Sequence, residues 1–230
     1  LIGPSGSCKT YTALTIATAL SPRVALIDTE RGSASKYADL FDFDVAELDS
    51  FSPDAYIALI RAAQSEYDVL VIDSLSHAWM GTGGILDQHD KAAKRSRNSF
   101  EAWRDVTPKH NALVDTMLGC KAHLIVTMRA KTEYAVSTDE KGKMKVEKLG
   151  LAPVQRDGVE YEFDVVADMD LQNTLIVSKS RCPRLTGAVI HRPGPDVAEI
   201  LRDWLSGEPV PEQTTSHPSS QSGGGAGEAT

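Results

Sequence analysis

The residues that most constrain the fold stand at the start of the chain, where residues 3–10 read Gly-Pro-Ser-Gly-Ser-Cys-Lys-Thr. This is the pattern of a phosphate-binding loop, G-x-x-x-x-G-K-[ST], except that Cys8 stands where the pattern has glycine. Such a loop curls its backbone N–H groups around an anion, at the positive N-terminal end of the helix that follows. The loop therefore predicts a nucleoside triphosphate site.

Within this loop each residue type answers a physical demand. The Lys9 ammonium would reach the β- and γ-phosphates, and the Thr10 hydroxyl would hold Mg²⁺. A side chain at Cys8 would strain the backbone if φ there is positive, unless the loop absorbs Cys8 with a small shift. The alternative to a nucleotide site is a glycine-rich turn before a helix. The predicted contacts to ATP come from Gly3, Pro4, Ser5, Gly6, Ser7, Cys8, Lys9, Thr10 and Tyr11.

The chain divides into a domain and a tail. Residues 1–205 carry the apolar segments, and 41% of the chain is hydrophobic, which suffices for one α/β domain with a sizeable core. Residues 206–230 are rich in Ser, Gly, Pro, Thr and Gln, and we expect them to be disordered. Only Leu1 and Ile2 remain of the buried strand that feeds such a loop, so we expect the first strand of the domain to be truncated.

Charge, cysteine usage and hydropathy bound the cellular setting. The formal net charge is −8, so any binding of DNA must be local rather than by bulk attraction. The cysteines Cys8, Cys120 and Cys182 have no disulfide-framework spacing, which is typical of a reducing cytoplasm. No apolar run approaches membrane-spanning length, and we expect no membrane partner.

Short apolar runs alternate with helical segments along the chain. The first predicted strands are continuous apolar runs, typical of strands buried on both faces: 24–27, 69–72 and 123–127. The predicted helices include 9–20, 53–63 with Ser52 as its N-cap, and 108–118. Two later strands, 163–167 and 174–177, flank a tight turn. The predicted fold class is therefore α/β, with a mostly parallel sheet, helices on both faces and an antiparallel extension.

Acidic residues follow two of these strands, at the edge where open α/β sheets build their sites. Asp73 ends the second apolar run, where it would face Thr10 and bind the Mg²⁺ shell. Asp28 and Glu30 follow the first run, and a carboxylate there could polarise the water that attacks the γ-phosphate. The alternative is that these acids cap the segments that follow them.

The order of these motifs resembles that of the RecA-like recombinase ATPases. The resemblance covers residues 1–205 and rests on the segments 3–10, 28–30, 67–74 and 124–129. Within that group the chain is similar to the phage-encoded ATPases of single-strand annealing or recombination. The resemblance implies a RecA-like fold, ATP and Mg²⁺ as ligands, and a place in the cytoplasm of a bacterial host as a phage or prophage protein.

The resemblance also implies roles for individual residues. Glu30 would activate the attacking water and Asp73 would be the acid associated with Mg²⁺. Arg129 stands at a position that is usually glutamine in the family, where the side chain senses the γ-phosphate. Together with Lys9, these form the predicted catalytic set. Lys179 and Arg181 fall where such filaments insert basic residues into the neighbouring subunit's ATP site, which implies a homo-oligomer with ATP at the subunit interface. The alternative for Lys179 and Arg181 is ordinary surface charge.

Residues 130–149 fall where RecA-like ATPases carry a mobile DNA-contacting loop, and we expect a flexible hairpin or loop there. With Arg129 included, the stretch has six basic residues against four acidic ones. Such a loop, with Tyr134 in it, could grip phosphates and stack a base of single-stranded DNA. The alternative is a solvated hairpin without a ligand.

The sequence as a whole predicts an ATP-binding, ATP-hydrolysing protein that acts on single-stranded DNA in phage recombination or annealing. Cys8 motivates one alternative, a module that binds nucleotide without hydrolysing it. A second alternative is a phosphate-loop NTPase unrelated to DNA that transfers a phosphoryl group to a small metabolite.

Overall fold

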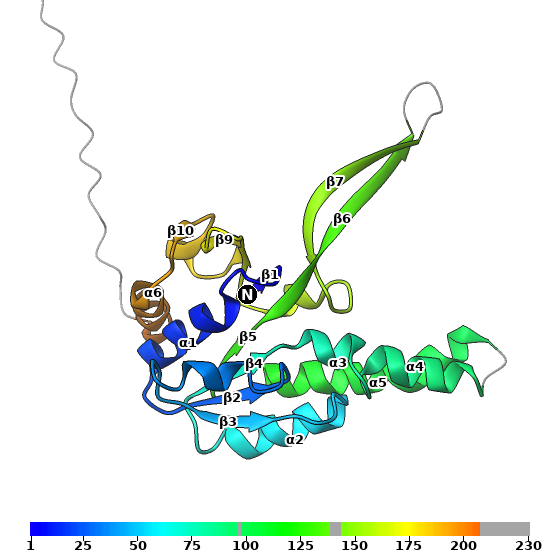
Figure 1. Ribbon diagram of the computed structural model, residues 1–230, viewed down its shortest axis with the longest axis horizontal. Coiled ribbons are helices and arrows are strands. Elements are labelled where there is room, and N and C mark those ends of the chain that lie inside the picture. The colour runs from blue at the N-terminus through cyan, green and yellow to red at the C-terminus, as the bar shows by residue number, and fades with distance from the viewer. Residues whose placement is uncertain (96–97, 139–143, 208–230) are drawn as a thin grey trace, which may run out of the picture.

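Two sheets and the helices around them make up the protein, in a computed structural model that describes residues 1–95, 98–138 and 144–207 (Figure 1). The four-stranded sheet is parallel throughout and has the spatial order β3 (Asp44–Glu47), β2 (Val24–Asp28), β4 (Val69–Asp73), β5 (His123–Val126). The six-stranded sheet has the order β10 (Val189–His191), β9 (Thr174–Ser180), β8 (Val165–Met169), β1 (Ile2–Gly3), β6 (Met128–Thr138), β7 (Met144–Pro153).

Strand β1 lies parallel to both β6 and β8, whereas the β6–β7, β8–β9 and β9–β10 pairs are antiparallel. The predicted α/β fold with a mostly parallel sheet and an antiparallel extension is confirmed. The parallel strands divide between the two sheets, and β1 pairs with β6 and β8. The chain passes from one sheet to the other at Thr127, between the end of β5 and the start of β6.

The core lies on both faces of the four-stranded sheet. One face packs under α1 (Lys9–Leu20) and includes Val24, Leu26, Val69 and Val71. The other face packs under α2 (Pro53–Ala63) and α5 (Ser99–Leu118) and includes Ile27, Leu70 and Ile72. Side chains of β2 and β4 thus alternate between two apolar clusters, as strands buried on both faces must. Burial on both faces fixes the register that brings the carboxyl ends of these strands to one edge.

Local signals explain where the helices begin. The bounds of α1 and α2 agree with the prediction, and the Ser52 hydroxyl accepts a hydrogen bond from the Ala55 N–H at 3.3 Å as an N-cap. Helix α5 begins at Ser99, earlier than predicted, because the Asn98 side chain caps it and Pro108 is accommodated inside. The other helices are α3 (Ser76–Met80), α4 (Ile85–Ala93) and α6 (Pro195–Ser206), with short 3₁₀ turns at η1 (Ala34–Tyr37), η2 (Val159–Glu162) and η3 (Pro183–Leu185).

Strands β6 and β7 form a hairpin that projects from the body of the molecule (Figure 1). Their register runs from Ala130 opposite Pro153 to Thr138 opposite Met144, which corresponds to a ribbon about 30 Å long at ~3.3 Å per residue. The expected flexible hairpin or loop is thus a hairpin, paired as an antiparallel ladder over its described part. Residues 139–143 lie outside the described residues, as do residues 208–230 of the predicted tail. No helix in the described ranges is long and apolar enough to cross a membrane.

Candidate nucleotide-binding and catalytic site

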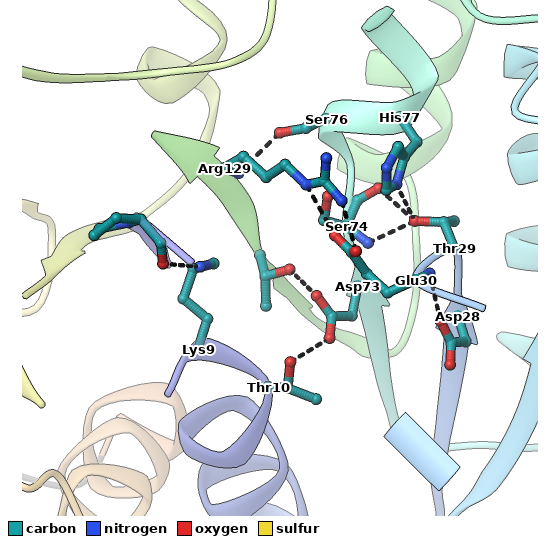
Figure 2. A network of polar contacts seen from close by, with 12 residues as sticks. Lys9, Thr10, Asp28, Thr29, Glu30, Asp73, Ser74, Ser76, His77 and Arg129 are labelled. Carbon is teal, nitrogen blue, oxygen red and sulfur yellow. Dashed lines mark hydrogen bonds and ion pairs between the residues drawn. The ribbon is translucent and has the colours of Figure 1, made fainter. Parts of the chain in front are cut away.

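The carboxyl ends of the parallel strands bring the predicted site residues to one edge of the fold (Figure 2). The register pairs Asp28 with Asp73 across β2 and β4, and Gly3 with Arg129 across β1 and β6. Lys9 and Thr10 open α1 directly after the loop. Segments far apart in the sequence therefore meet around one point, as the motif order requires of an open α/β site.

The phosphate loop keeps a curled backbone despite its departure from the pattern. Gly6 has φ of +83°, and Cys8 has φ of 59° with ψ of 25°, so both occupy the left-handed region. Cys8 therefore adopts the conformation that a glycine would take, at a cost of about 1–2 kcal/mol for a residue with a Cβ. At Gly3 a Cβ would lie 2.5 Å from Ser7 Oγ and 2.6 Å from the Met169 carbonyl oxygen, so only glycine fits.

The loop and the first turn of α1 form an anion cradle. The Thr12 N–H donates to the Cys8 carbonyl at 2.9 Å, so the N–H groups that precede it in α1 have no acceptor within the helix. Lys9 Nζ folds back over the loop and donates to the Pro4 carbonyl at 2.7 Å. Burial lowers the pKa of Lys9, while the charges of Asp73 and Glu30 oppose that shift. A polyphosphate in the cradle would replace the Pro4 carbonyl as the partner of the ammonium.

Asp73 is held by two hydroxyl groups. Thr10 Oγ1 donates to Asp73 Oδ2 at 2.5 Å, and Thr127 Oγ1 donates to Asp73 Oδ1. Asp73 is 3% exposed, and burial raises its pKa, whereas the hydrogen bonds from Thr10 and Thr127 lower it. The two hydrogen bonds hold both carboxylate oxygens in place next to the start of α1. The peptide bond between Asp73 and Ser74 is cis.

The chemistry of these donors fits Mg²⁺. The ion prefers oxygen ligands, keeps several waters and is commonly held by one or two protein oxygens together with substrate phosphates. Thr10 and Asp73 supply a hydroxyl and a carboxylate beside the phosphate loop. Within the described ranges no group of three or more His, Cys, Asp or Glu side chains is arranged to hold a metal ion. An ion at this site would thus depend on the nucleotide for its remaining ligands.

Glu30 and Arg129 form a bidentate ion pair. Arg129 Nε donates to Glu30 Oε1 at 3.0 Å, and Nη2 donates to Oε2 at 2.6 Å (Figure 2). The turn that carries Glu30 is shaped by Asp28, whose Oδ1 accepts the Glu30 N–H at 2.5 Å. Asp28 is buried and points into the fold, so Glu30 is the carboxylate that this turn presents to the site.

A polar network behind Glu30 was missed by the sequence reasoning. The Thr29 hydroxyl accepts the Ser74 N–H at 2.8 Å and lies 2.7 Å from His77 Nδ1. The Tyr56 hydroxyl donates to the Ser74 carbonyl at 3.2 Å, and burial lowers the pKa of His77. The only signal in the sequence was that Thr29, Ser74 and His77 adjoin the two strand-end acids. The network ties the end of β2 to the end of β4.

The remaining predicted residues have partners outside the phosphate loop. Lys179 Nζ donates to backbone carbonyls of the η2 turn, at 2.8 Å to Phe163 and 3.3 Å to Glu160. Arg181 pairs with Asp164 at 2.7 Å between exposed side chains. The Tyr11 ring, 39% exposed, packs edge to face against Phe41 with ring centroids 5.3 Å apart. The geometry of one chain thus brings Lys9, Thr10, Glu30, Asp73 and Arg129 together and leaves Lys179 and Arg181 on local partners.

Comparisons with known proteins agree with this geometry. A search of curated protein sequences finds no match. The crystal structure of the RadB recombinase matches with a TM-score of 0.50 and 17% identity, over 83% of this chain and 84% of that chain. At this identity the likeness concerns the fold, and it confirms the predicted RecA-like architecture. A model of an AAA domain family, AAA_24, matches residues 1–189, which implies a nucleotide-binding domain. Because that match spans most of its length, the chain belongs to this AAA domain family.

Proposed function

We propose that the chain is a RecA-like ATPase that binds Mg²⁺·ATP, hydrolyses it and acts on single-stranded DNA in recombination or annealing. The observation that carries the proposal is the meeting of four groups at one sheet edge: the cradle with Lys9, the Thr10 hydroxyl, the buried Asp73 and the Glu30 carboxylate. This set supplies a phosphate cradle, ligands for Mg²⁺ and an acceptor for the proton of the attacking water, three of the parts used in phosphoryl transfer to water.

The chain's residues divide the chemistry between them. The N–H groups of the loop and the Lys9 ammonium bind and orient the phosphates and stabilise charge that develops on the γ-phosphoryl oxygens. Thr10 and Asp73 would hold Mg²⁺, which when bound neutralises charge on the β- and γ-phosphates. Glu30 orients the attacking water and accepts its proton, which requires the carboxylate to be free of other partners.

Hydrolysis is favoured over simple nucleotide binding by two observations. Cys8 departs from the motif in its side chain but keeps the left-handed backbone that the loop needs. Glu30 stands on a turn that Asp28 fixes, which is more than a binding module requires. The phosphate loop therefore retains its shape and the site retains an acid for the attacking water.

Single-stranded DNA as the partner is supported by the β6–β7 hairpin. It begins at the site itself, with Arg129 as its second residue, and projects away from the body of the molecule (Figure 1). The RadB structure that shares this fold is described as a recombinase. Four basic residues lie on its two strands, Arg129, Lys131, Lys145 and Lys148, and we propose that they grip the DNA backbone by local charge. The phage context is a further part of the proposal, supported by the resemblance of the sequence motifs.

The catalytic part of the proposal is tested by Glu30→Gln. The variant keeps the size of the side chain, so we expect affinity for ATP to stay within about threefold while hydrolysis falls by about 10²–10⁴-fold. Equilibrium binding of a fluorescent ATP analogue and steady-state release of phosphate measure the two quantities separately. Glu66→Gln is the matched control, because Glu66 is exposed and precedes β4, at the opposite end of that strand from Asp73. Equal loss in both variants, or no loss in Glu30→Gln, would refute the assignment.

We further propose a homo-oligomer in which Arg181, with Lys179, reaches the ATP site of a neighbour. Support comes from the position of these residues in the sequence motif order, and Arg181 is exposed enough to exchange Asp164 for a phosphate. A mixture of two inactive variants tests this: Lys9→Met, with a defective cradle, and Arg181→Ala, with an intact one. We expect the mixture to regain hydrolysis. At some interfaces the phosphate loop of an Arg181→Ala subunit would face Arg181 of a Lys9→Met subunit, so both parts would be intact there. A mixture as inactive as its parts would count against action in trans.

A further inference from the structure

The Glu30–Arg129 pair has a consequence for regulation of the proposed reaction. We infer that Arg129 is a positioning residue that locks Glu30 in the resting chain, and that displacement of the β6–β7 hairpin releases the lock. The inference rests on the proposed function, because it assigns Glu30 to the attacking water. It goes beyond that function by stating what keeps hydrolysis low when the hairpin has no ligand.

The first observation is that the guanidinium occupies both carboxylate oxygens of Glu30. The contacts are 3.0 Å to Oε1 and 2.6 Å to Oε2, the parallel geometry in which arginine binds carboxylates most strongly. Because both oxygens are engaged, a water molecule must displace the guanidinium before it can donate a hydrogen bond to Glu30. Glutamine, or any uncharged side chain, would not hold Glu30 in this way.

The second observation is that the backbone of Arg129 is bound on both sides. Its N–H donates to Ser76 Oγ at 2.9 Å, and its carbonyl accepts the Val154 N–H at 2.7 Å. Val154 follows the last residue of β7, so this bond closes the base of the hairpin. Gly3, the first residue of the phosphate loop, pairs with Arg129 on the other side. Arg129 thus contacts the hairpin base, α3 and the start of the phosphate loop at once.

The third observation is that the pair can be broken without unfolding the core. The Arg129 side chain is 41% exposed and that of Glu30 27% exposed, so water and salt limit the strength of the pair. Movement of the backbone of Arg129 would part the two side chains, and the β6–β7 hairpin is attached to that backbone.

The lock predicts reciprocal coupling between the hairpin and the nucleotide. If a strand of DNA bound to the hairpin favours the unlocked state, it raises the rate of hydrolysis and changes the affinity for nucleotide. By linkage, nucleotide then changes the affinity for DNA by the same factor. Coupling between sites in proteins commonly amounts to about 5–150-fold. The chain needs no second protein to obtain this control.

The test is Arg129→Gln, which keeps a polar side chain of similar length and removes the ion pair. Hydrolysis of ATP and binding of a non-hydrolysable ATP analogue are each measured with and without oligothymidine. Arg156→Gln is the matched control, because Arg156 lies just beyond the hairpin base and contacts Asn111, not Glu30. We expect Arg129→Gln to raise hydrolysis without DNA by about fivefold or more, and to bring the ratio of rates with and without DNA close to one.

The outcomes separate the lock from the proposed function. An Arg129→Gln variant with a lower rate in both conditions would overturn the lock and make Arg129 a direct contributor to catalysis. An unchanged ratio of rates would overturn it as well. If the unaltered chain binds ATP without hydrolysing it, the proposed function fails, and the lock is then tested by binding of the ATP analogue. DNA should change the affinity for the analogue in the unaltered chain and in Arg156→Gln. It should leave that affinity unchanged in Arg129→Gln. Equal DNA effects in all three would overturn it.

Discussion

The two halves of the site are held by different kinds of contact. In the phosphate-loop half, comprising Lys9, Thr10, Asp73 and Thr127, the central carboxylate is buried and bound by hydroxyl groups from α1 and from the junction of β5 and β6. In the glutamate half, comprising Glu30 and Arg129, the carboxylate is partly exposed and bound by a single charged side chain.

This difference separates what is fixed from what is released. Buried hydrogen bonds to a carboxylate are costly to break, so the phosphate-loop half is rigid and ready for nucleotide. A half-exposed ion pair contributes little to stability and can be exchanged at low cost. In the proposed mechanism, the half that binds nucleotide therefore stays constant, and control falls on Glu30, the proposed acceptor of the proton from the attacking water. Variants in the two halves should therefore fail in different ways.

The largest effect is expected from Asp73→Asn in the phosphate-loop half. Loss of the carboxylate removes the charged ligand for Mg²⁺, so we expect Mg²⁺-dependent binding of ATP to weaken by about 10²-fold or more, the order expected when a charged partner is lost. The nucleotide-free variant should melt no lower than the unaltered chain, because a buried carboxylate with a raised pKa is costly to keep ionised. Isothermal titration with ATP and Mg²⁺ measures the first quantity, and thermal unfolding the second.

Normal binding of ATP by Asp73→Asn would contradict the division of the site into a metal-binding half and a glutamate half. If Asp73→Asn bound ATP normally with Mg²⁺ present, the phosphate-loop half would not be the metal-binding half. Asp54→Asn, at the exposed first turn of α2, is a control for the removal of one negative charge.

Thr127→Val should destabilise the protein, whereas Arg129→Gln should not. Valine leaves Asp73 Oδ1 buried without its donor, which costs about 1–3 kcal/mol of unfolding free energy. For a domain of this size that corresponds to a fall in Tm of about 2–4 °C per kcal/mol. Thr127→Ser keeps the hydroxyl and should recover most of the loss. Equal melting of Thr127→Val and Arg129→Gln would show that the two halves are equally rigid.

Cys8→Gly sharpens the comparison within the phosphate loop. Glycine removes the strain of a Cβ at φ of 59°, worth about 1–2 kcal/mol, but loses part of that gain to the greater freedom of the unfolded chain. We expect a net rise in Tm of about 1–4 °C. Cys8→Ala removes the thiol but keeps the Cβ, and its Tm should match that of the unaltered chain. A rise in Cys8→Ala as large as in Cys8→Gly would place the effect in the thiol instead of the backbone.

The smallest expected effect is a dependence of stability and of nucleotide affinity on pH, which should arise from Asp73 in the phosphate-loop half. Burial raises the pKa of Asp73, so the folded protein takes up its proton at a higher pH than the unfolded chain does. The sign follows from linkage: Asp73 stabilises the nucleotide-free fold below its unfolded pKa, and this contribution is lost as pH rises through its folded pKa. Affinity for Mg²⁺·ATP should change in the other direction and fall as pH is lowered from neutrality. The difference between affinities at pH 7 and pH 5.5 should be smaller in a metal-free titration.

How much of the site could be predicted depends on how local its signals are. The bounds of α1 and the N-cap at Ser52 follow from neighbouring residues, and Thr10 and Asp73 from a motif that demands a strand-end acid. The pairing of Arg129 with Glu30 joins residues 99 apart, and no local pattern encodes it. For residues 130–149 the sequence left a hairpin and a loop open, because charged residues are typical of both, whereas cross-strand pairing decides between them.

The most direct test of the account is steady-state hydrolysis of ATP by the unaltered chain with and without single-stranded oligothymidine. The central claim is that the β6–β7 hairpin, which carries Arg129 as its second residue, controls the carboxylate of Glu30. The account predicts a low rate without DNA and a rate about fivefold or more higher with saturating DNA. A measurable rate that is the same in both conditions would contradict it, because hydrolysis would then be independent of the hairpin.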